Sequence, residues 1–186
     1  MLDPIDWTTL AKQLGLLANG GEKSSSGDAR RALEILIGRP AIRASVDHYI
    51  TGAPGSELAR SVLWLMRPWS AMVYCYDIWR SSPSIGDRRA AVELLRVVAD
   101  RRALNWVGQF LEDKDDAIQA WGAGVLDQLL WSNLVEPEEA EPVLVRAENH
   151  SSAAVRERVG FIRGYLRRRA CQKQENNDDE PPPSNV

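Results

Sequence analysis

Residues 86–131 decide the fold, with the sequence GDRRAAVELLRVVADRRALNWVGQFLEDKDDAIQAWGAGVLDQLLW. Apolar residues recur in this stretch at three- and four-residue spacing, which is the period of one helix face. The three apolar sets are Ala91, Leu94, Leu95 and Val98; then Ala103, Trp106, Val107, Phe110 and Leu111; then Trp121, Val125, Leu126, Leu129 and Leu130. Asp100 separates the first two sets, and a polar turn over residues 112–115 separates the last two. The stretch therefore predicts three helices joined by tight turns.

Working outward, helix boundaries follow from capping residues and from Gly and Pro. Asp3 is the expected cap of a first helix over residues 3–18, and residues 19–27 have the composition of a loop. Gly38 is placed to end a helix, and Pro40, Pro68 and Pro137 are placed to begin others. Pro142 is expected to distort the helix that Pro137 opens. No segment shows strand-like alternation, so the prediction is an all-α fold of about ten helices.

Five capping residues restart a helix at intervals of 28 to 36 residues: Asp28, Ser56, Asp87, Asp116 and Ser152. The openings are DARRALEIL, SELARSVLWL, DRRAAVELL, DAIQAWGAGVL and SAAVRERVGFI. This shared pattern over residues 28–168 resembles the HEAT-like repeat family, and the resemblance implies a short αα-solenoid. A non-repeating helical bundle has the same periodicities and is the alternative.

One helical-repeat domain is expected over residues 1–170, followed by a disordered, acidic and proline-rich tail over residues 171–186. No apolar run approaches the roughly 20 residues that a membrane-spanning helix needs. The start, MLDPIDW, has acids where a signal peptide carries basic residues, so the expected location is the cytoplasm. Cys75 is expected to fill the core and Cys171 to be a thiol in the tail.

Signatures of catalysis, metal binding and cofactor binding are absent from the sequence. The two histidines, His48 and His150, are far apart, and no HExxH, CxxC, GxSxG or phosphate-loop pattern occurs. The cluster Asp113, Asp115 and Asp116 has neither the glycine nor the final glutamate of a calcium loop. The expectation is that the protein is not an enzyme and takes no cofactor.

Aromatic residues are abundant, with seven Trp in 186 residues. For any single Trp, packing between helices is the simpler interpretation, and an interface is the alternative. The helix WSAMVYCYDIWR, residues 69–80, is apolar on nearly every side. It is therefore either central in the fold or exposes a patch for a partner, and the sequence does not decide between the two.

Charge is unevenly distributed along a chain whose net charge is only −3. Residues 111–148 hold ten acids and two bases, a net charge of −8, whereas the last helix is rich in arginine. The acids predict either a solvated face with helix-capping carboxylates or a docking surface for a basic partner. The arginines of the last helix are expected to pair either with neighbouring acids or with the C-terminal dipole of their own helix.

Small helical proteins with HEAT-like repeats, acidic patches and many aromatics resemble bacterial immunity proteins, which neutralise a cognate toxin. This resemblance implies a binding module that captures another protein, one that is basic, and contacts neither nucleic acid nor membrane. The alternatives are a HEAT-like adaptor and, among enzymes of HEAT-like fold, a lyase or a DNA glycosylase. The candidate partner-binding residues are Tyr76, Asp77, Arg80, Trp106, Glu112, Asp113, Asp115, Glu138 and Glu139.

Overall fold

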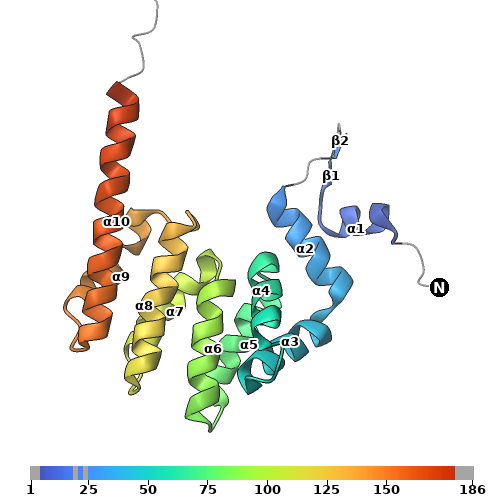
Figure 1. Ribbon diagram of the computed structural model, residues 1–186. Coiled ribbons are helices and arrows are strands. Elements are labelled where there is room, and N and C mark those ends of the chain that lie inside the picture. Colours follow the sequence, from blue (N-terminus) through green and yellow to red (C-terminus); the bar gives the residue numbers. More distant parts are fainter. Residues whose placement is uncertain (1–4, 19–20, 23–24, 179–186) are drawn as a thin grey trace, which may run out of the picture. The chain divides into compact units, whose positions relative to one another are not determined.

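The computed structural model describes residues 5–18, 21–22 and 25–178, and these are helical almost throughout (Figure 1). The α-helices are α1 (Trp7–Gln13), α2 (Ser26–Ile37), α3 (Arg39–Thr51), α4 (Ser56–Met66), α5 (Trp69–Ser81), α6 (Ile85–Val98), α7 (Leu104–Leu111), α8 (Asp116–Trp131), α9 (Pro137–Glu148) and α10 (Ala153–Asp178). A 3-10 turn, η1 (Arg101–Ala103), precedes α7, and a short ladder pairs β1 (Leu17–Ala18) with β2 (Gly21–Glu22) in antiparallel register. Within the described residues, the prediction of an all-α fold of about ten helices is confirmed.

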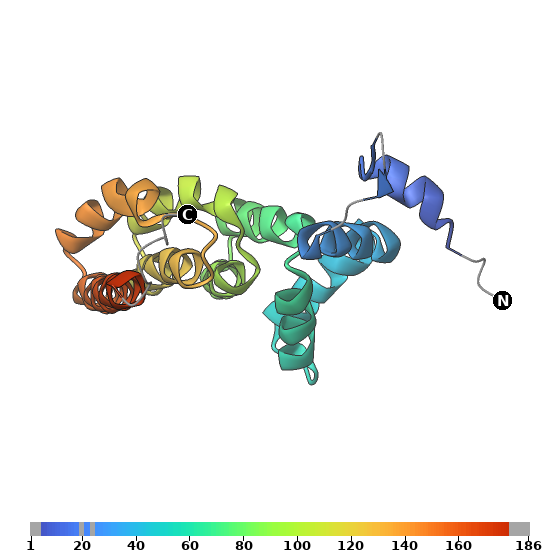
Figure 2. The same ribbon diagram turned by 90° about the horizontal axis from the view of Figure 1, so that it is seen from above.

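The chain divides into two compact units, which we call the N-terminal unit (residues 1–100) and the C-terminal unit (residues 101–186). In the N-terminal unit, the pair α3 and α4 stacks on the pair α5 and α6 through α3–α5 and α4–α6 contacts. In the C-terminal unit, α7 with α8 stacks on α9 with α10 in the same way. Figure 2 shows α8 and α10 side by side in one layer of this unit. The single repeat domain over residues 1–170 stays a prediction.

Two of the helices have their N-cap residue three positions before the acid that was expected to cap them. Ser25 is the N-cap of α2, and the backbone N–H of Asp28 donates to its Oγ at 3.2 Å. Ser84 caps α6 in the same way, with the N–H of Asp87 donating at 3.2 Å. Both aspartates occupy the third helical position of a Ser-x-x-Asp pattern. The prediction was wrong here because serine and aspartate are both good caps and an acid at the third position is also favoured.

Smaller shifts occur at three other helix starts. The side chain of Asp115, rather than that of Asp116, accepts hydrogen bonds from the first turn of α8. Gly55, in the left-handed region at φ 94°, is the N-cap residue of α4 instead of Ser56. Asp6 caps α1, which ends at Gln13; Asp3 lies outside the described residues. At α8 a neighbouring aspartate takes the place of the expected cap, whereas Gly55 makes no side-chain hydrogen bond to the first turn of α4.

Helix α10 continues to Asp178, so residues 171–178 are helical although their composition assigned them to a disordered tail. Because each added residue of an existing helix gains a backbone hydrogen bond, a helix can extend beyond its last packed residue. Figure 1 shows α10 running past the helices on which it packs. Residues 179–186, the rest of the predicted tail, lie outside the described residues.

A long-range cap fixes α2 to the beginning of α5. Pro68 precedes α5 and has no side chain that can accept a hydrogen bond from its first turn. The carboxylate of Glu34 in α2 accepts instead, from the N–H of Trp69 at 3.0 Å and from the N–H of Ser70 at 2.8 Å. This contact is important for α2, because no residue of that helix is buried.

Packing in the C-terminal unit is closest where α7 crosses α8. Gly122 of α8 faces Phe110 of α7, and a methyl group placed on Gly122 would overlap the Phe110 Cβ. Phe110 is completely buried, so it has no open space into which it could move. The absence of a side chain at Gly122 is therefore what allows the two helices to approach.

The substitution Gly122→Ala should destabilise the protein by about 1–3 kcal/mol, because the added methyl group overpacks this crossing. The matched control is Gly160→Ala in α10, where a Cβ meets nothing within 4 Å. That variant should be stabilised by about 0.5–1 kcal/mol through helix propensity alone. Urea denaturation followed by circular dichroism measures both, and equal stabilities for the two variants would contradict this packing.

Candidate functional site

Six of the nine candidate binding residues belong to the C-terminal unit, on α7, on α9 and in the turn after α7. Trp106 lies on α7 and is half-buried; the other five are Glu112, Asp113, Asp115, Glu138 and Glu139. Because α7 packs on α9, most of these residues lie along one layer of the unit. Their role in binding a partner stays a prediction.

The carboxylates in this layer are largely occupied by the protein itself. Glu139 is paired with Arg101 and Glu112 with Arg146. Asp115 accepts from the N–H groups of Ala117 and Ile118 at 3.1 Å each. Asp113 accepts from the N–H of Asp115 at 3.0 Å, which tightens the turn between α7 and α8. Among the candidate acids, Glu138 is exposed and has no ion pair within the part of the chain that is described.

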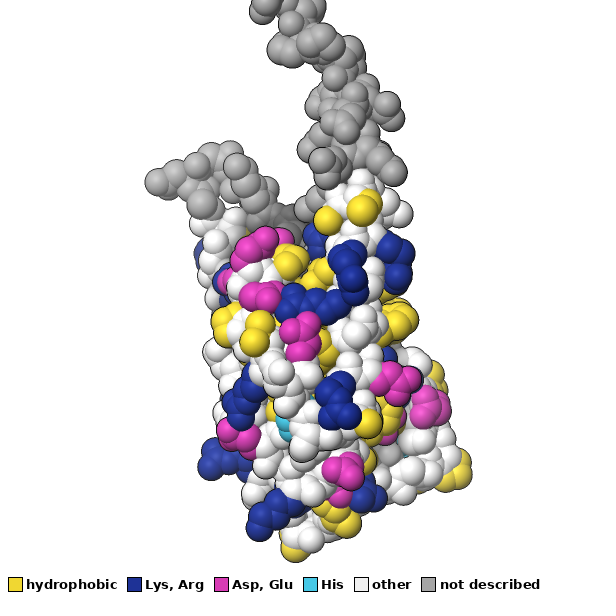
Figure 3. Space-filling view, turned by 90° about the vertical axis from the view of Figure 1, so that its left-hand side faces the viewer, with side chains coloured by type: hydrophobic (Ala, Val, Ile, Leu, Met, Phe, Trp, Pro, Cys, Tyr) yellow, Lys and Arg dark blue, Asp and Glu magenta, His cyan; other side chains and the backbone are white. Residues whose placement is uncertain are grey.

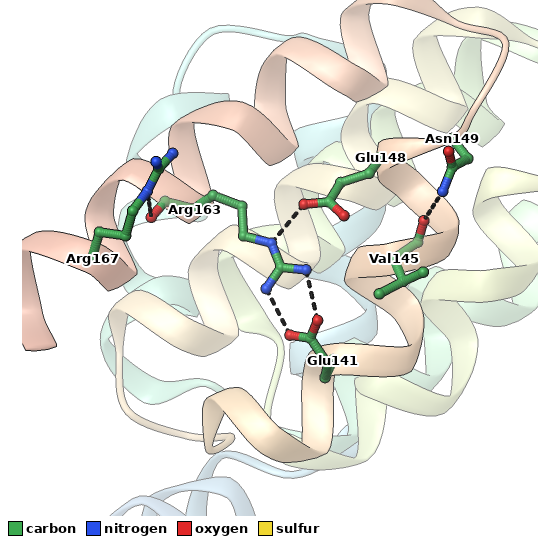
Figure 4. Close-up of polar contacts among 6 residues, drawn as sticks. All are labelled: Glu141, Val145, Glu148, Asn149, Arg163 and Arg167. Carbon is green, nitrogen blue, oxygen red and sulfur yellow. Dashed lines mark hydrogen bonds and ion pairs between the residues drawn. The ribbon is translucent and has the colours of Figure 1, made fainter.

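The arginines of α10 continue this pairing. The guanidinium of Arg163 donates to both carboxylate oxygens of Glu141 at 2.6 and 2.8 Å, and its Nε donates to Glu148 at 2.6 Å (Figure 4). These hydrogen bonds hold the pKa of the Glu141 carboxyl below its ordinary value and raise the pKa of Arg163. Arg158 Nη1 lies 3.5 Å from an oxygen of Asp127. For Arg158 and Arg163, the expectation that the last helix pairs with neighbouring acids is confirmed.

The strongly acidic surface expected over residues 111–148 is therefore largely balanced. Residues 101–172 of this unit hold eleven carboxylates and ten basic side chains, a net charge of −1 for that segment. Figure 3, which faces α9 and α10, shows acidic and basic side chains interspersed. The net charge of residues 111–148 overestimated the negative charge of this surface. Arg101, Arg158 and Arg163, which pair with its acids, lie outside that segment of the sequence.

The other three candidates, Tyr76, Asp77 and Arg80, lie on α5 in the N-terminal unit. Tyr76 is half-buried; its ring centroid lies 5.4 Å from that of Trp79, and the Arg80 guanidinium lies 5.8 Å from the Tyr76 centroid. Asp77 and Arg80 are exposed. Elsewhere on α5 the residues Ala71, Met72 and Cys75 are fully buried, and the helix packs on α3 and α6. The central position of α5 is thus the better of the two interpretations.

Surface aromatic and aliphatic side chains occur where the sequence analysis did not place them. Trp7, Trp64 and Trp131 are exposed, and the other four Trp are half-buried. Packing between helices therefore does not by itself explain the positions of the tryptophans. On α4, Leu58 is 70% exposed, Val62 43% and Leu65 65%. Their spacing of four and three residues makes one uncovered apolar stripe. The sequence pattern that indicates such a stripe is a helix with apolar residues on two sides.

A groove of about 450 Å³ runs between α8 and α10 in the C-terminal unit. Trp121 and Phe161 are its aromatic side chains, and Phe161 is 55% exposed. Its small residues are Ala117, Ala120 and Ala154, and its charged residues are Glu157 and Arg158. Beyond it on the same helices, the rings of Trp131 and Tyr165 lie 4.6 Å apart between centroids. None of these residues was among the candidates.

Reactive groups are few in the described part of the chain. Both cysteines are free, and Cys75 is buried as expected, which raises the pKa of its thiol and makes it unreactive. His150 is used structurally: its Nδ1 accepts from the N–H of Ser152 at 3.1 Å, and its Nε2 lies 2.9 Å from the carbonyl oxygen of Leu111. Among the described residues, no group of three His, Cys, Asp or Glu side chains is placed to hold a metal ion. No described helix is both long and apolar enough to cross a bilayer.

Comparison with known proteins gives no relative. The chain matches no family model, no curated protein and no solved structure. The functional interpretation accordingly depends on the surfaces described above.

The Arg163 bridge gives stability an acid dependence. A carboxyl whose pKa is lower in the folded than in the unfolded chain stabilises the fold above its unfolded pKa, and this contribution is lost as the pH falls. The ordinary pKa of a glutamate carboxyl is 4.5. The stability difference between the wild type and Glu141→Gln should therefore be constant near neutral pH and shrink below about pH 4.5.

Urea denaturation of both proteins between pH 7 and pH 3 measures this difference. The control makes the same substitution in an Arg163→Leu chain, where the cause of the pKa shift is absent and the pH dependence should disappear. A difference that stays constant down to pH 3 in the chain with Arg163 would show that the bridge does not form in solution.

Proposed function

We propose that this chain is a short HEAT-like αα-solenoid that binds another protein and neutralises it. The solenoid form is supported by the way one helix pair stacks on the next inside each unit. A stack of packed helices presents a preformed surface, so little conformational entropy opposes association. The partner class to test first is a bacterial toxin, because the protein resembles immunity proteins in size and helical organisation.

The observation that carries the proposal is the apolar stripe of Leu58, Val62 and Leu65 on α4. Exposed apolar side chains at one helical spacing are typical of a surface that a partner covers. Covering one exposed leucine stabilises a complex by roughly 1.5–3 kcal/mol, so two leucines account for a substantial part of a specific affinity. Trp64, also exposed on α4, is of the residue type most enriched at interface hot spots.

The balanced charges of the C-terminal unit change the role proposed for its acids. Carboxylates that already pair with arginine or accept from the first turn of a helix gain little from a basic partner, because a new contact replaces an old one. We therefore assign the candidate acids Glu112, Asp115 and Glu139 to folding in the first place. Glu138, which is exposed and has no ion pair among the described residues, keeps the role of a docking residue.

A rescue experiment tests the proposal. The products of reading frames adjacent to this gene are expressed alone and together with this chain, and growth and co-purification are measured. One neighbouring product should arrest growth alone, and this chain should restore growth and co-purify with it. The variant Leu58→Glu/Leu65→Glu should lose rescue by weakening binding at least a hundredfold, as expected for two leucines worth about 3 kcal/mol or more together.

The control is Val145→Glu, which makes the same kind of change at an exposed apolar side chain on α9. It should rescue growth as the wild type does, and circular dichroism should show all variants folded. If no adjacent product is toxic, or if several unrelated proteins co-purify in place of one, the neutralising role is wrong. Several partners would favour the adaptor alternative.

A further inference from the structure

The groove between α8 and α10 is open because of the residues that line it. Where α8 faces α10, alanines occupy positions at which larger side chains would fill the space: Ala117, Ala120 and Ala154. Phe161 stands beside this gap with about half of its surface in water, and Trp121 is half-buried. Leaving an aromatic ring exposed costs hydrophobic free energy that a ligand filling the groove would recover.

The charge inside the groove is not balanced. Arg158 lies 3.5 Å from Asp127, so its positive charge is offset by a carboxylate on α8. Glu157 also lines the groove; it is exposed, and no ion pair to it occurs within the described part of the chain. Asp116, exposed in the first turn of α8, is next to Ala117 in the sequence but does not line the groove. The groove thus combines aromatic surface with one exposed carboxylate, Glu157, that no base among the described residues offsets.

We propose that this groove binds a lysine- or arginine-bearing helical segment of the protein partner. The aliphatic part of the basic side chain packs between Trp121 and Phe161, and its charged end pairs with Glu157. This combination suits a long cationic side chain, which has an apolar stem and a hydrated head and is attracted to aromatic faces. The inference rests on the proposed function and specifies the chemistry of the partner.

The stacked rings of Trp131 and Tyr165 extend the site along the same two helices. Trp131 follows Trp121 by ten residues, which corresponds to about 15 Å along α8. A segment that contacts both aromatic sites must span this distance, and a helix of roughly ten residues does so. An amphipathic helix laid along two parallel helices is an established mode of peptide recognition.

Two synthetic peptides test the proposal directly. Both are fluorescein-labelled amphipathic helices of equal length and leucine content, one with lysine and arginine on its polar face and one with glutamate. Fluorescence anisotropy is measured against the full chain. The basic peptide should bind, the acidic peptide should not, and Glu157→Lys should weaken binding of the basic peptide at least tenfold. Phe161→Ala should weaken it similarly.

The matched control is Glu57→Lys, which makes the same charge change at an exposed carboxylate on α4, in the other unit. It should leave binding of the basic peptide unchanged to within twofold. If Glu57→Lys weakens binding as much as Glu157→Lys, the attraction is non-specific and the proposal is wrong. It is equally wrong if both peptides bind alike or if neither binds.

The Leu58→Glu/Leu65→Glu variant separates this inference from the proposed function. It should bind the basic peptide normally, because α4 belongs to the other unit, although it should fail in the rescue experiment. Loss of peptide binding in this variant would contradict the assignment of the peptide to the groove. If rescue succeeds with the wild-type chain and Glu157→Lys has no effect on it, the neutralising role stands and the groove is not its site.

Discussion

Most helices in the described part of the chain bury their apolar faces only by packing against neighbouring helices, and this constraint determines the rest of the structure. An α-helix of 8 to 16 residues is marginal in water by itself, so most of its stability comes from packing. In the C-terminal unit, α8 needs α7 on one side and α10 on the other, and Gly122 allows Phe110 close enough to complete the first of these contacts. The same dependence links α5 to α6 and α3 in the N-terminal unit.

The surfaces that this packing leaves uncovered are where we expect function. Ion pairs such as Arg163 with Glu141 and Glu148 join neighbouring helices and use carboxylates that would otherwise form a docking surface. What remains is apolar or locally unbalanced: the α4 stripe in one unit, and the α8–α10 groove with Glu157 in the other. The binding that we propose therefore depends less on overall charge than on a few side chains that are exposed in the described part of the chain.

The features that could be read from the sequence are the local ones. Helical periodicity predicted the buried faces of α6, α7 and α8. Leu94, Phe110 and Leu129, one on each helix, belong to apolar sets at three- and four-residue spacing, and all three are fully buried. Helix starts were less certain, since Ser84 and Asp87 are both suitable caps three residues apart. The long-range contacts could not be predicted: Glu34 caps α5 from 35 residues away, and Arg163 neutralises acids 15 and 22 residues before it. The exposure of Leu58 and Phe161 depends on which helices pack beside them, and a local sequence pattern does not predict those tertiary neighbours.

Stability should reside in the stacked helix pairs and decline toward helices with few buried residues. Native-state hydrogen exchange of the full chain measures this distribution. We expect the slowest exchange in α6 and α8, whose buried residues run along most of their length, and fast exchange in α2, which buries none. Protection of α2 equal to that of α6, or exchange in α8 as fast as in α2, would contradict the account.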